Sequence, residues 1–434
     1  MKDFRDSDET SAADFGHPGS ARQGDAPEVK KFVPGELPVV YLKTERKSSH
    51  PWIFQKMVEK PDPKPRNGAV VDIVDRTGAW VGRGLYNGHS RIALRVLTTD
   101  EAEDINRKFF DKMLRQAISL RRETLKLDNV TDSYRLVHSE GDGLSGLVID
   151  KFADMIVVEF FSSGMYRFRE TILQTLAEYF PGCKFYWFAE DHVQKQESMD
   201  IRSPAVPEPF VIEEHGLKFK VAPGSKHKTG FFVDQRENRM TLAQVVKDAA
   251  SVKAAAGGEG GVSVLDICCN SGGFAVYAKA LGGAAEVVGL DLDESVIEIA
   301  EENARLNKAK IKFVQVDLFH WLREAIQRGL KYDVVILDPA KQTRSREEVD
   351  KALRKYMDMN RLAMQVVKPG GILLSCSCTG LVSEADFLNS IRKAAWQAQR
   401  TAQIFRVTGA APDHPWASHV AEGRYLKAVW ARIL

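Results

Sequence analysis

The sequence lacks a hydrophobic segment long enough to cross a membrane. A membrane helix needs about 20 consecutive apolar residues, and no apolar run in this chain of 434 residues approaches that length. The N-terminal stretch MKDFRDSDETSAADFGHPGS also has no apolar core of the kind found in secretory signals. With 44% hydrophobic and 28% charged residues, the composition is that of an ordinary soluble protein. We therefore expect a cytoplasmic protein without a membrane partner.

Cysteine is scarce, which argues against a disulfide framework. The chain has five cysteines, an odd number, and no secretory signal accompanies them.

The net charge is only +2, so it does not by itself indicate a nucleic-acid partner. Its distribution is uneven, because residues 1–30 lean acidic and residues 43–95 lean basic. A basic module is a hint of nucleic-acid binding, although charge alone favours an ordinary solvated surface.

The length and the residue pattern predict several domains. A chain of 434 residues is too long for a single hydrophobic core. Residues 1–33, rich in Ser, Asp, Gly and Ala, are expected to form a disordered tail. Short alternating segments with turn signals predict a small all-β domain at 34–105. A helical linker, expected at 103–124, leads into a predicted small α+β middle domain within 106–205, and the last domain takes 206–434.

Strands and helices alternate from residue 262 onward, after an expected hairpin with its turn at 214–216 and a helix at 235–250. The expected strands are 263–269, 286–292, 311–317, 332–340 and 370–378, with helices at 273–281, 294–307, 319–329, 346–367 and 384–397. The strands are runs of Val, Ile and Leu, which is typical of strands covered on both faces. The pattern predicts an α/β fold with a doubly wound parallel sheet. Ligands of such sheets bind beyond the carboxyl ends of the strands.

Several polar residues and glycines fall at those carboxyl ends. VLDICCNSGGF at 264–274 combines a strand, a turn with Gly272 and Gly273, and the start of a helix. Glycines at such a turn let the backbone approach a ligand closely. Asp291 ends the next strand, where an acid can hold ribose hydroxyls, and Asp317 ends the third, where it could face an adenine amino group. Helix capping is the alternative role. Since the phosphate fingerprint G-x-G-x-x-G is poorly met, S-adenosylmethionine (SAM) fits better than NAD.

LDPAKQ at 337–342 ends the fourth strand. Asp338, at the strand tip beside Pro339, can form hydrogen bonds with the edge of a planar base. It can equally be a turn carboxylate that caps the next helix. The stretch alone does not separate these two roles.

The fifth strand ends in two thiols, in GGILLSCSCTGL at 370–381. Core packing, metal ligation and nucleophilic catalysis are the three candidate roles for a cysteine here. Packing is the expected role of Cys183, and Cys268 and Cys269 can also be packing residues. The C-C and C-x-C spacings differ from zinc-binding C-x₂₋₄-C pairs, so no metal is expected. Cys378 lies at the strand tip and Cys376 deeper on the same face. Cys378 is therefore the better candidate nucleophile, with packing left open.

Several segments resemble the bacterial 23S ribosomal RNA cytosine-5 methyltransferases, in which a PUA-type RNA-binding domain is fused to a class I SAM methyltransferase domain. In the first 220 residues the resemblance rests on HPWIF, VVDIVDRTGAWVGRGLYN, SRIALRVL, DSYRLVHSEGDGLSGLVIDKF and EEHGLKFKV. Farther on it rests on HKTGFFVDQRENR, VLDICCNSGGFAVYA, DPAK, SCTGL and DHPWASHVAEGRYLK. It spans the chain from about residue 37 to the C-terminus. The resemblance implies a PUA-like domain at 34–105, a methyltransferase domain at 206–434 and ribosomal RNA as the partner.

The resemblance also implies roles for individual residues. The family's cofactor-flanking segment corresponds to Lys228, Thr229, Gln235 and Arg236. The methionine end of SAM would be surrounded by Asp266, Gly272, Gly273 and Phe274. Asp291 would hold the ribose, and Asp317 would lie on the adenine side. Cys378 matches the catalytic cysteine of the family's Ser-Cys-Ser-Gly, and Asp338 matches the aspartate of Asp-Pro-Pro-Lys.

Two positions depart from the family pattern, and three hypotheses remain. Ala340 replaces the second proline of the family motif, and Gln342 replaces the following aromatic residue, so both could alter how the target base is seated. Cys376 is an extra thiol without an assigned role. The leading hypothesis is a cytosine-5 methyltransferase acting on large-subunit ribosomal RNA. The alternatives are methylation of another rRNA base position, either an amino group or guanine, and a non-catalytic RNA-binding protein. A homodimer is one assembly that the sequence leaves open.

Overall fold

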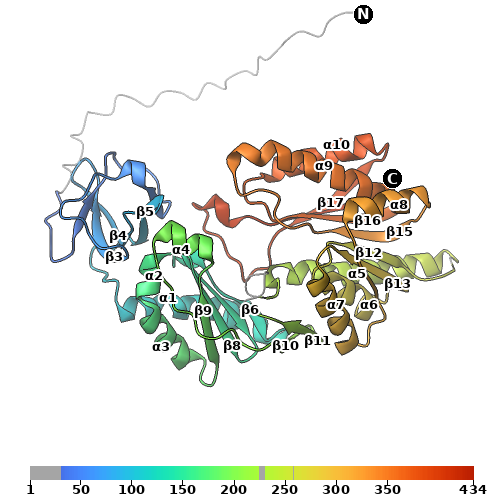
Figure 1. The fold of residues 1–434 in the computed structure, drawn as a ribbon, viewed down its shortest axis with the longest axis horizontal. Coiled ribbons are helices and arrows are strands. Elements are labelled where there is room, and N and C mark those ends of the chain that lie inside the picture. Colours follow the sequence, from blue (N-terminus) through green and yellow to red (C-terminus); the bar gives the residue numbers. More distant parts are fainter. Residues whose placement is uncertain (1–30, 224–229, 258) are drawn as a thin grey trace, which may run out of the picture.

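The structure, a computed structural model, describes residues 31–223, 230–257 and 259–434 of the chain. Its first domain is a five-stranded sheet in the order β1-β3-β4-β5-β2 (Figure 1, blue). The strands are β1 (Val39–Tyr41), β2 (Trp52–Phe54), β3 (Ala69–Val74), β4 (Trp80–Tyr86) and β5 (Ile92–Thr98). Alternating residues of these strands form one buried cluster that includes Val40, Ile73 and Leu94. The all-β prediction is confirmed for this region. Of the tail predicted at 1–33, residues 1–30 lie outside the described residues.

The middle region is a four-stranded sheet with helices. The strands, in the order β6-β7-β8-β9, are β6 (Ser133–His138), β7 (Leu147–Phe152), β8 (Met155–Phe160) and β9 (Lys184–Phe188). The helices are α1 (Arg107–Ser119), α2 (Ser163–Arg167), α3 (Arg169–Tyr179) and α4 (Asp191–Glu197). The Asn106 side chain caps α1, which continues into a π-helical turn at Leu120–Thr124. The long helix predicted at 103–124 is thus shorter and ends irregularly. Cys183 packs against the core of this region, as predicted.

A hairpin joins this region to the last domain. Strands β10 (Phe210–Glu214) and β11 (Leu217–Val221) pair antiparallel around a tight turn. The two turn residues, His215 and Gly216, both have positive φ, which suits the twist of a two-residue hairpin loop. The hairpin prediction is confirmed. The buried Glu214 carboxylate accepts hydrogen bonds from Arg239 and from the hydroxyl of Tyr277, so the hairpin is anchored to two helices of the last domain.

The last domain is built on a seven-stranded sheet in the order β14-β13-β12-β15-β16-β18-β17. The strands are β12 (Ser263–Ile267), β13 (Glu286–Asp291), β14 (Lys312–Gln315), β15 (Tyr332–Leu337), β16 (Val367–Ser377), β17 (Ala402–Thr408) and β18 (Lys427–Ile433). The first five are parallel, as predicted. The prediction omitted β17 and β18, which are antiparallel to their neighbours. The strand order reverses direction between β12 and β15, and a ligand crevice is expected at such a point.

Helices cover both faces of this sheet. They are α5 (Arg236–Ala255), α6 (Gly273–Ala280), α7 (Glu294–Leu306), α8 (Leu318–Gln327), α9 (Val349–Gln365) and α10 (Glu384–Gln397). Figure 1 shows α5, α6 and α7 below the sheet and α8, α9 and α10 above it. Each helix layer contributes to a buried cluster with the strands that it covers. The sheet is therefore buried on both sides, which explains its runs of aliphatic residues.

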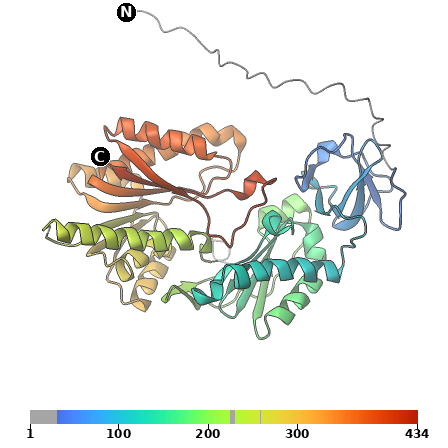
Figure 2. The same ribbon diagram turned by 180° about the vertical axis from the view of Figure 1, so that it is seen from behind.

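The segment between β17 and β18, residues 409–426, connects all three regions and is called the C-terminal strap below. It runs from the sheet of the last domain toward the other two regions (Figure 2, red). The buried Asp413 carboxylate accepts hydrogen bonds from both terminal nitrogens of Arg236, at 3.1 and 2.9 Å, and from the backbone N–H of Arg135 at 2.9 Å. Its carbonyl oxygen accepts from Arg121 at 2.7 Å. Farther along the strap, the Glu422 carboxylate lies 3.2 Å from His50 of the first domain.

Close backbone packing also holds the strap. A Cβ atom on Gly141 of the middle region would lie 1.9 Å from the carbonyl oxygen of Pro415, so only glycine permits this approach. The first domain is tied to the middle region by the buried Glu197, whose carboxylate accepts from Asn87 at 2.9 Å and Ser90 at 2.7 Å. These contacts tie both the first domain and the strap to the middle region.

We expect Asp413→Ala to lower the free energy of unfolding by about 3–5 kcal/mol, because it removes the buried counter-charge of the fully buried Arg236 guanidinium and leaves only the half-exposed Glu237 near its Nε atom. Urea titration followed by circular dichroism would measure the change. The matched control is Asp154→Ala, which removes an exposed carboxylate 3.9 Å from Lys184 and should leave the unfolding curve unchanged. Equal effects of the two substitutions would contradict a structural role for the buried pair.

Candidate functional site

Three strand ends meet at the point where the strand order reverses. Asp266 lies near the end of β12, Asp338 directly follows β15, and Cys378 directly follows β16. Because these strands are parallel neighbours, their carboxyl ends share one edge of the sheet. The backbone N–H of Asp338 donates to the carbonyl of Ile267 at 3.2 Å, and Cys378 Sγ lies 4.0 Å from the carbonyl oxygen of Pro339. The motifs that were separate in sequence thus form one site.

The turn after β12 has an unusual backbone. Cys268 and Asn270 have positive φ values of 61° and 48°, and Gly272 follows with 78°. A Cβ atom on Gly272 would lie 3.0 Å from Phe313 and 3.1 Å from Ala300, so a larger residue would be strained and crowded. Non-glycine residues in this conformation cost free energy and often occur at functional sites.

Asp266 is a buried carboxyl group with one unused oxygen. Its Oδ2 accepts from the backbone N–H of Ala275 at 3.0 Å, whereas Oδ1 has no hydrogen-bond partner among the described residues. Burial, followed by repulsion from Asp338 and Asp291, raises the pKa of Asp266 to about 8. A cationic group with N–H donors would relieve both the repulsion and the missing hydrogen bond. The methionine ammonium of SAM has both properties, and its sulfonium adds a second positive charge, so the residues fit that cofactor.

Asp291 and Asp317 both bind backbone N–H groups at their turns. Asp291 accepts from Asn270 at 2.9 Å and from Asp293 at 3.1 Å. Asp317 is exposed and caps α8 by accepting from the N–H of His320 at 3.0 Å. The capping role that the sequence left open is therefore present at Asp317. Any contact of these two carboxylates with a nucleoside would be additional to these bonds.

The segment before α5 contributes one residue to the site and one to the domain interface. Gln235 donates from Nε2 to Asp338 Oδ2 at 2.9 Å, and Asn238 orients it by donating to Gln235 Oε1 at 2.6 Å. Arg236 is fully buried and directed to Asp413. Phe274, expected near the methionine end of SAM, has its side chain in the core beneath the sheet. Lys228 and Thr229 lie outside the described residues.

Asp338 has the electrostatic character of a proton donor at neutral pH. Burial and the nearby Asp234 carboxylate raise the pKa of Asp338 to about 7, against the opposing hydrogen bond from Gln235. A carboxyl group whose pKa is raised in this way keeps a protonated population near neutral pH. It can therefore donate a hydrogen bond to a ring nitrogen as well as accept one.

The cysteines differ in burial and reactivity. Burial raises the pKa of the Cys268, Cys269 and Cys376 thiols, and neighbouring carboxylates add to the effect. Neutral buried thiols are poor nucleophiles. Cys376 is fully buried in the core cluster of one sheet face, which indicates packing as its role. Cys378, two residues farther on, is partly exposed at the strand tip.

A buried polar network, which the sequence did not reveal, supports the Cys378 turn. Thr379 Oγ1 lies 2.7 Å from the hydroxyl of Tyr356 and accepts from the backbone N–H of Gln342 at 3.0 Å. Ser377 Oγ donates to the same tyrosine at 3.0 Å. Lys427 Nζ donates to the carbonyl oxygens of Thr379 and Val382, both at 2.8 Å. In the sequence, Tyr356 looks like an ordinary helix residue and Lys427 like an ordinary surface residue. Only the folded structure shows that both contact the turn that carries Cys378.

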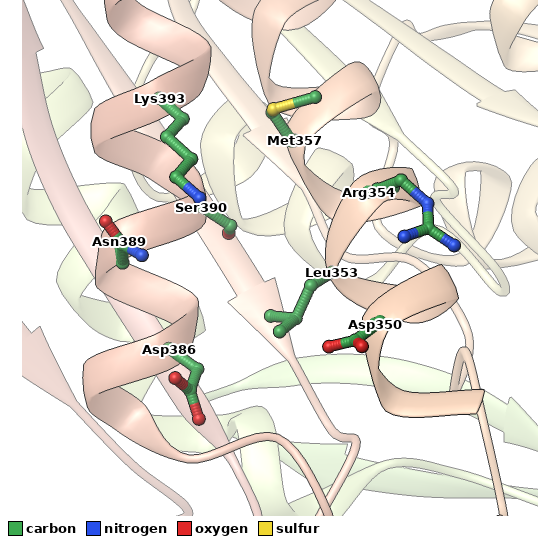
Figure 3. Close-up of a pocket in the computed structure, with 8 residues that line it drawn as sticks. All are labelled: Asp350, Leu353, Arg354, Met357, Asp386, Asn389, Ser390 and Lys393. Atoms are coloured by element: carbon green, nitrogen blue, oxygen red, sulfur yellow. The ribbon is translucent and has the colours of Figure 1, made fainter. Parts of the chain in front are cut away.

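Another cavity lies away from these residues. It is an open groove of about 180 Å³ between α9 and α10. Figure 3 shows its lining, with Asp350 and Asp386 at one end and the cations Arg354 and Lys393 elsewhere. None of the predicted site residues lines it. Across the described ranges, no group of three or more His, Cys, Asp or Glu side chains is arranged to hold a metal, and no helix has the length and apolar character to cross a membrane.

Comparisons with known proteins agree with this division of the chain. A family profile for a PUA-like domain matches residues 43–99, and one for a methyltransferase domain matches residues 259–418. A ribosomal RNA large subunit methyltransferase I of Tolumonas auensis is 39% identical over 408 residues, covering 91% of this chain and 99% of that protein. The protein of the same name from Aeromonas hydrophila is 39% identical over 406 residues, covering 91% and 98%.

Solved structures share the fold. SMU.776, a proposed methyltransferase complexed with SAH, aligns with a TM-score of 0.74 at 20% identity, covering 91% of this chain and 99% of that chain. A proposed SAM-dependent methyltransferase from Streptococcus mutans aligns with a TM-score of 0.73 at 19% identity, covering 91% and 100%. The predicted fold class is confirmed: a PUA-like domain precedes a class I methyltransferase domain, whose cofactor is SAM.

We expect SAM binding to release protons and to strengthen as pH rises from 6 to 8. Below its raised pKa of about 8 Asp266 is mainly protonated, and a cationic ligand favours the ionised form. Calorimetry at one pH, in buffers of different ionisation enthalpy, would measure the released protons. Asp266→Asn should lose most of this release, whereas Asp248→Asn, at an exposed position on α5, should retain it. A SAM affinity independent of pH across this range would contradict the assignment.

Proposed function

The chain belongs to the ribosomal RNA large subunit methyltransferase I family, and from this we propose that it methylates carbon 5 of a cytosine in 23S ribosomal RNA. The observation that carries the proposal is the position of the Cys378 thiol, at the tip of β16 and 4.0 Å from the carbonyl of Pro339, the residue after Asp338. A thiol and a partly protonated carboxyl group beside the cofactor crevice are two of the groups that this reaction needs. The PUA-like domain and the rRNA named in the relatives support ribosomal RNA as the substrate.

Cys378 would act as the nucleophile. Carbon 5 of cytosine is a weak nucleophile in the intact ring. Addition of the Cys378 thiolate at carbon 6 breaks the 5,6 double bond and leaves carbon 5 enamine-like. When bound, SAM supplies the electrophilic methyl group that carbon 5 accepts. Loss of the carbon-5 proton to a base then restores the double bond, and the thiolate leaves.

Asp338 would hold the base. Gln235 occupies its Oδ2, so Oδ1 remains for the N3 and amino edge of cytosine. The protonated carboxyl group donates to N3 as negative charge develops there during thiolate addition. Its raised pKa makes this form available at neutral pH. The target cytosine must leave its stack to reach this crevice, so a single-stranded or flipped nucleotide is the expected substrate.

The cofactor would lie over the turn after β12. Asp266 Oδ1 is the proposed acceptor for the methionine ammonium group, and Gly272 and Gly273 allow close approach of the cofactor. We propose Asp291 for the ribose and Asp317 for the adenine side. Arg236 and Phe274 would act indirectly, since their side chains are engaged in the domain interface and the core. Lys228 and Thr229 remain candidates on sequence grounds.

Two rival functions have distinct signatures. Methylation of a base amino group uses an Asp/Asn-Pro-Pro-aromatic motif, which the segment Asp338 to Lys341 fits poorly, and it would leave Cys378 without a chemical role. A non-catalytic RNA-binding protein would not need to bind SAM. SAM affinity measured by calorimetry separates this second rival from both enzymes.

The decisive assay is nucleoside mass spectrometry of protein-free 23S ribosomal RNA after incubation with the protein and methyl-labelled SAM. Label in 5-methylcytidine supports the proposal, and label in any other nucleoside overturns it. If no label appears although SAM is bound, the same assay on ribosomal subunits follows. Absence of label on both substrates counts against the enzyme.

We expect Cys378→Ala to abolish formation of 5-methylcytidine and to leave SAM affinity unchanged, because it removes the nucleophile without altering the cofactor crevice. The matched control is Cys376→Ala, which removes the buried thiol two residues away and should retain methylation. Labelled-methyl incorporation and calorimetry measure the two quantities. Full activity of the Cys378 variant would remove the assignment.

We expect Asp338→Asn to reduce kcat by about 10²–10³-fold, since the amide can donate a hydrogen bond but cannot supply a proton. In the wild type the protonated form is present below the raised pKa of about 7 and is lost as pH rises through it, so activity should decline on the alkaline side. The variant should lack that decline. A wild-type profile that rises steadily to pH 9 would argue against a protonated Asp338.

A further inference from the structure

Lys427 is a buried cation next to the nucleophile turn. It is the first residue of β18 and is only 3% exposed. Antiparallel pairing of β18 with β16 sets it opposite Ser377, the residue before Cys378. Its ammonium group donates to the carbonyl oxygens of Thr379 and Val382, each at 2.8 Å. Those two carbonyls belong to the turn that carries the thiol from β16 into α10.

The surroundings of Lys427 do not neutralise its charge. Both acceptors are uncharged carbonyl oxygens, and in the described part of the chain no carboxylate lies within ion-pair distance of its ammonium group. Burial lowers the pKa of Lys427 to about 8, while the neighbouring Cys378 and Glu384 act in the opposite direction. A buried cation without a counter-ion is costly, so its presence beside the nucleophile turn calls for an explanation.

We propose that Lys427 is the positioning residue of the nucleophile: its ammonium group holds the 379–382 turn through two carbonyls and favours the thiolate form of Cys378. This inference rests on the proposed role of Cys378 as nucleophile. It assigns the counter-charge of the thiolate to Lys427, the last residue of the DHPWASHVAEGRYLK segment, to which the resemblance gave no role.

The other charged groups around Cys378 are of both signs. Lys341, from the loop after β15, and Arg424, from the C-terminal strap, face the same region as Lys427. Glu384 at the start of α10 is paired with Arg424 at 2.6 Å. Asp338, with its pKa raised to about 7, carries only part of a negative charge at neutral pH. From α9, Tyr356 faces the thiol as a neutral phenol, because burial raises its pKa to about 12.

The test measures thiol ionisation in the full chain. Iodoacetamide alkylation of Cys378 is followed by peptide mass spectrometry at a series of pH values, so the other four cysteines do not interfere. In Lys427→Gln the amide can still donate to the turn but the charge is gone. We expect the alkylation profile to shift to higher pH and the rate at pH 7 to fall on the order of tenfold. The methylation kcat at pH 7 should fall similarly, with unchanged SAM affinity.

Two further variants separate charge from structure. Lys427→Arg keeps the positive charge and should retain a profile close to that of the wild type. Lys368→Gln removes a partly buried lysine at the opposite end of β16, where it pairs with Asp333 at 2.8 Å, and should leave Cys378 alkylation unchanged. A loss of stability shared by both glutamine variants, without a shift of the thiol profile, would mean a purely structural role.

An unchanged alkylation profile in Lys427→Gln overturns the inference. If that variant does not fold, the wild-type profile decides instead, because a Cys378 thiol that titrates at or above the ordinary pKa of about 8.5 has no electrostatic assistance. Alkylation requires no RNA and no methyl transfer. A shifted profile together with absence of 5-methylcytidine would therefore refute the proposed function while preserving the role of Lys427 toward the thiol.

Discussion

The buried ion pair between Arg236 and Asp413 connects the parts of the molecule on which function depends. Arg236 begins α5 beside the cofactor crevice, and Asp413 lies in the C-terminal strap. The same Asp413 binds the backbone of Arg135 and, through its carbonyl, the side chain of Arg121 in the middle region. Such a pair contributes little net stability compared with apolar packing, but loss of either partner is costly. It therefore specifies how the regions fit together.

The C-terminal strap also links the Arg236–Asp413 ion pair to the turn that follows the proposed nucleophile. Beyond Asp413 it contacts His50 of the PUA-like domain through Glu422, and it ends where Lys427 binds the turn after Cys378. The proposed RNA-binding domain and the proposed nucleophile are thus held by one continuous segment.

The charged groups of the candidate site are separated by sign. Asp266, whose pKa is raised, faces the proposed cationic cofactor, and Asp338, whose pKa is also raised, faces the proposed target base, whereas cations gather around the thiol.

The sequence predicts those strands, turns and candidate residues that are determined by residues close together in the chain. Buried strands such as β12 and β15 are aliphatic runs, and glycine or aspartate marks the turns that follow them, so the parallel core was predicted with its edge of candidate residues. β2 has only three residues, and β17 is an edge strand whose Ile404 and Phe405 are exposed, so neither shows a clear burial pattern. Arg236, Phe274 and Lys427 are defined by partners distant in sequence. Their burial against Asp413, the core and the Cys378 turn could not be read from local pattern.

The central claim is that Cys378 forms a covalent bond to carbon 6 of the target cytosine. The most direct measurement incubates the protein and SAM with 23S ribosomal RNA in which cytosine is replaced by 5-fluorocytosine. Fluorine at carbon 5 cannot leave as a proton does, so the adduct remains after methyl transfer. We predict a denaturant-stable protein–RNA complex whose digestion yields a nucleotide bound to the peptide containing Cys378. Methylation of unsubstituted RNA without such a complex, or a complex through another residue, would contradict the mechanism.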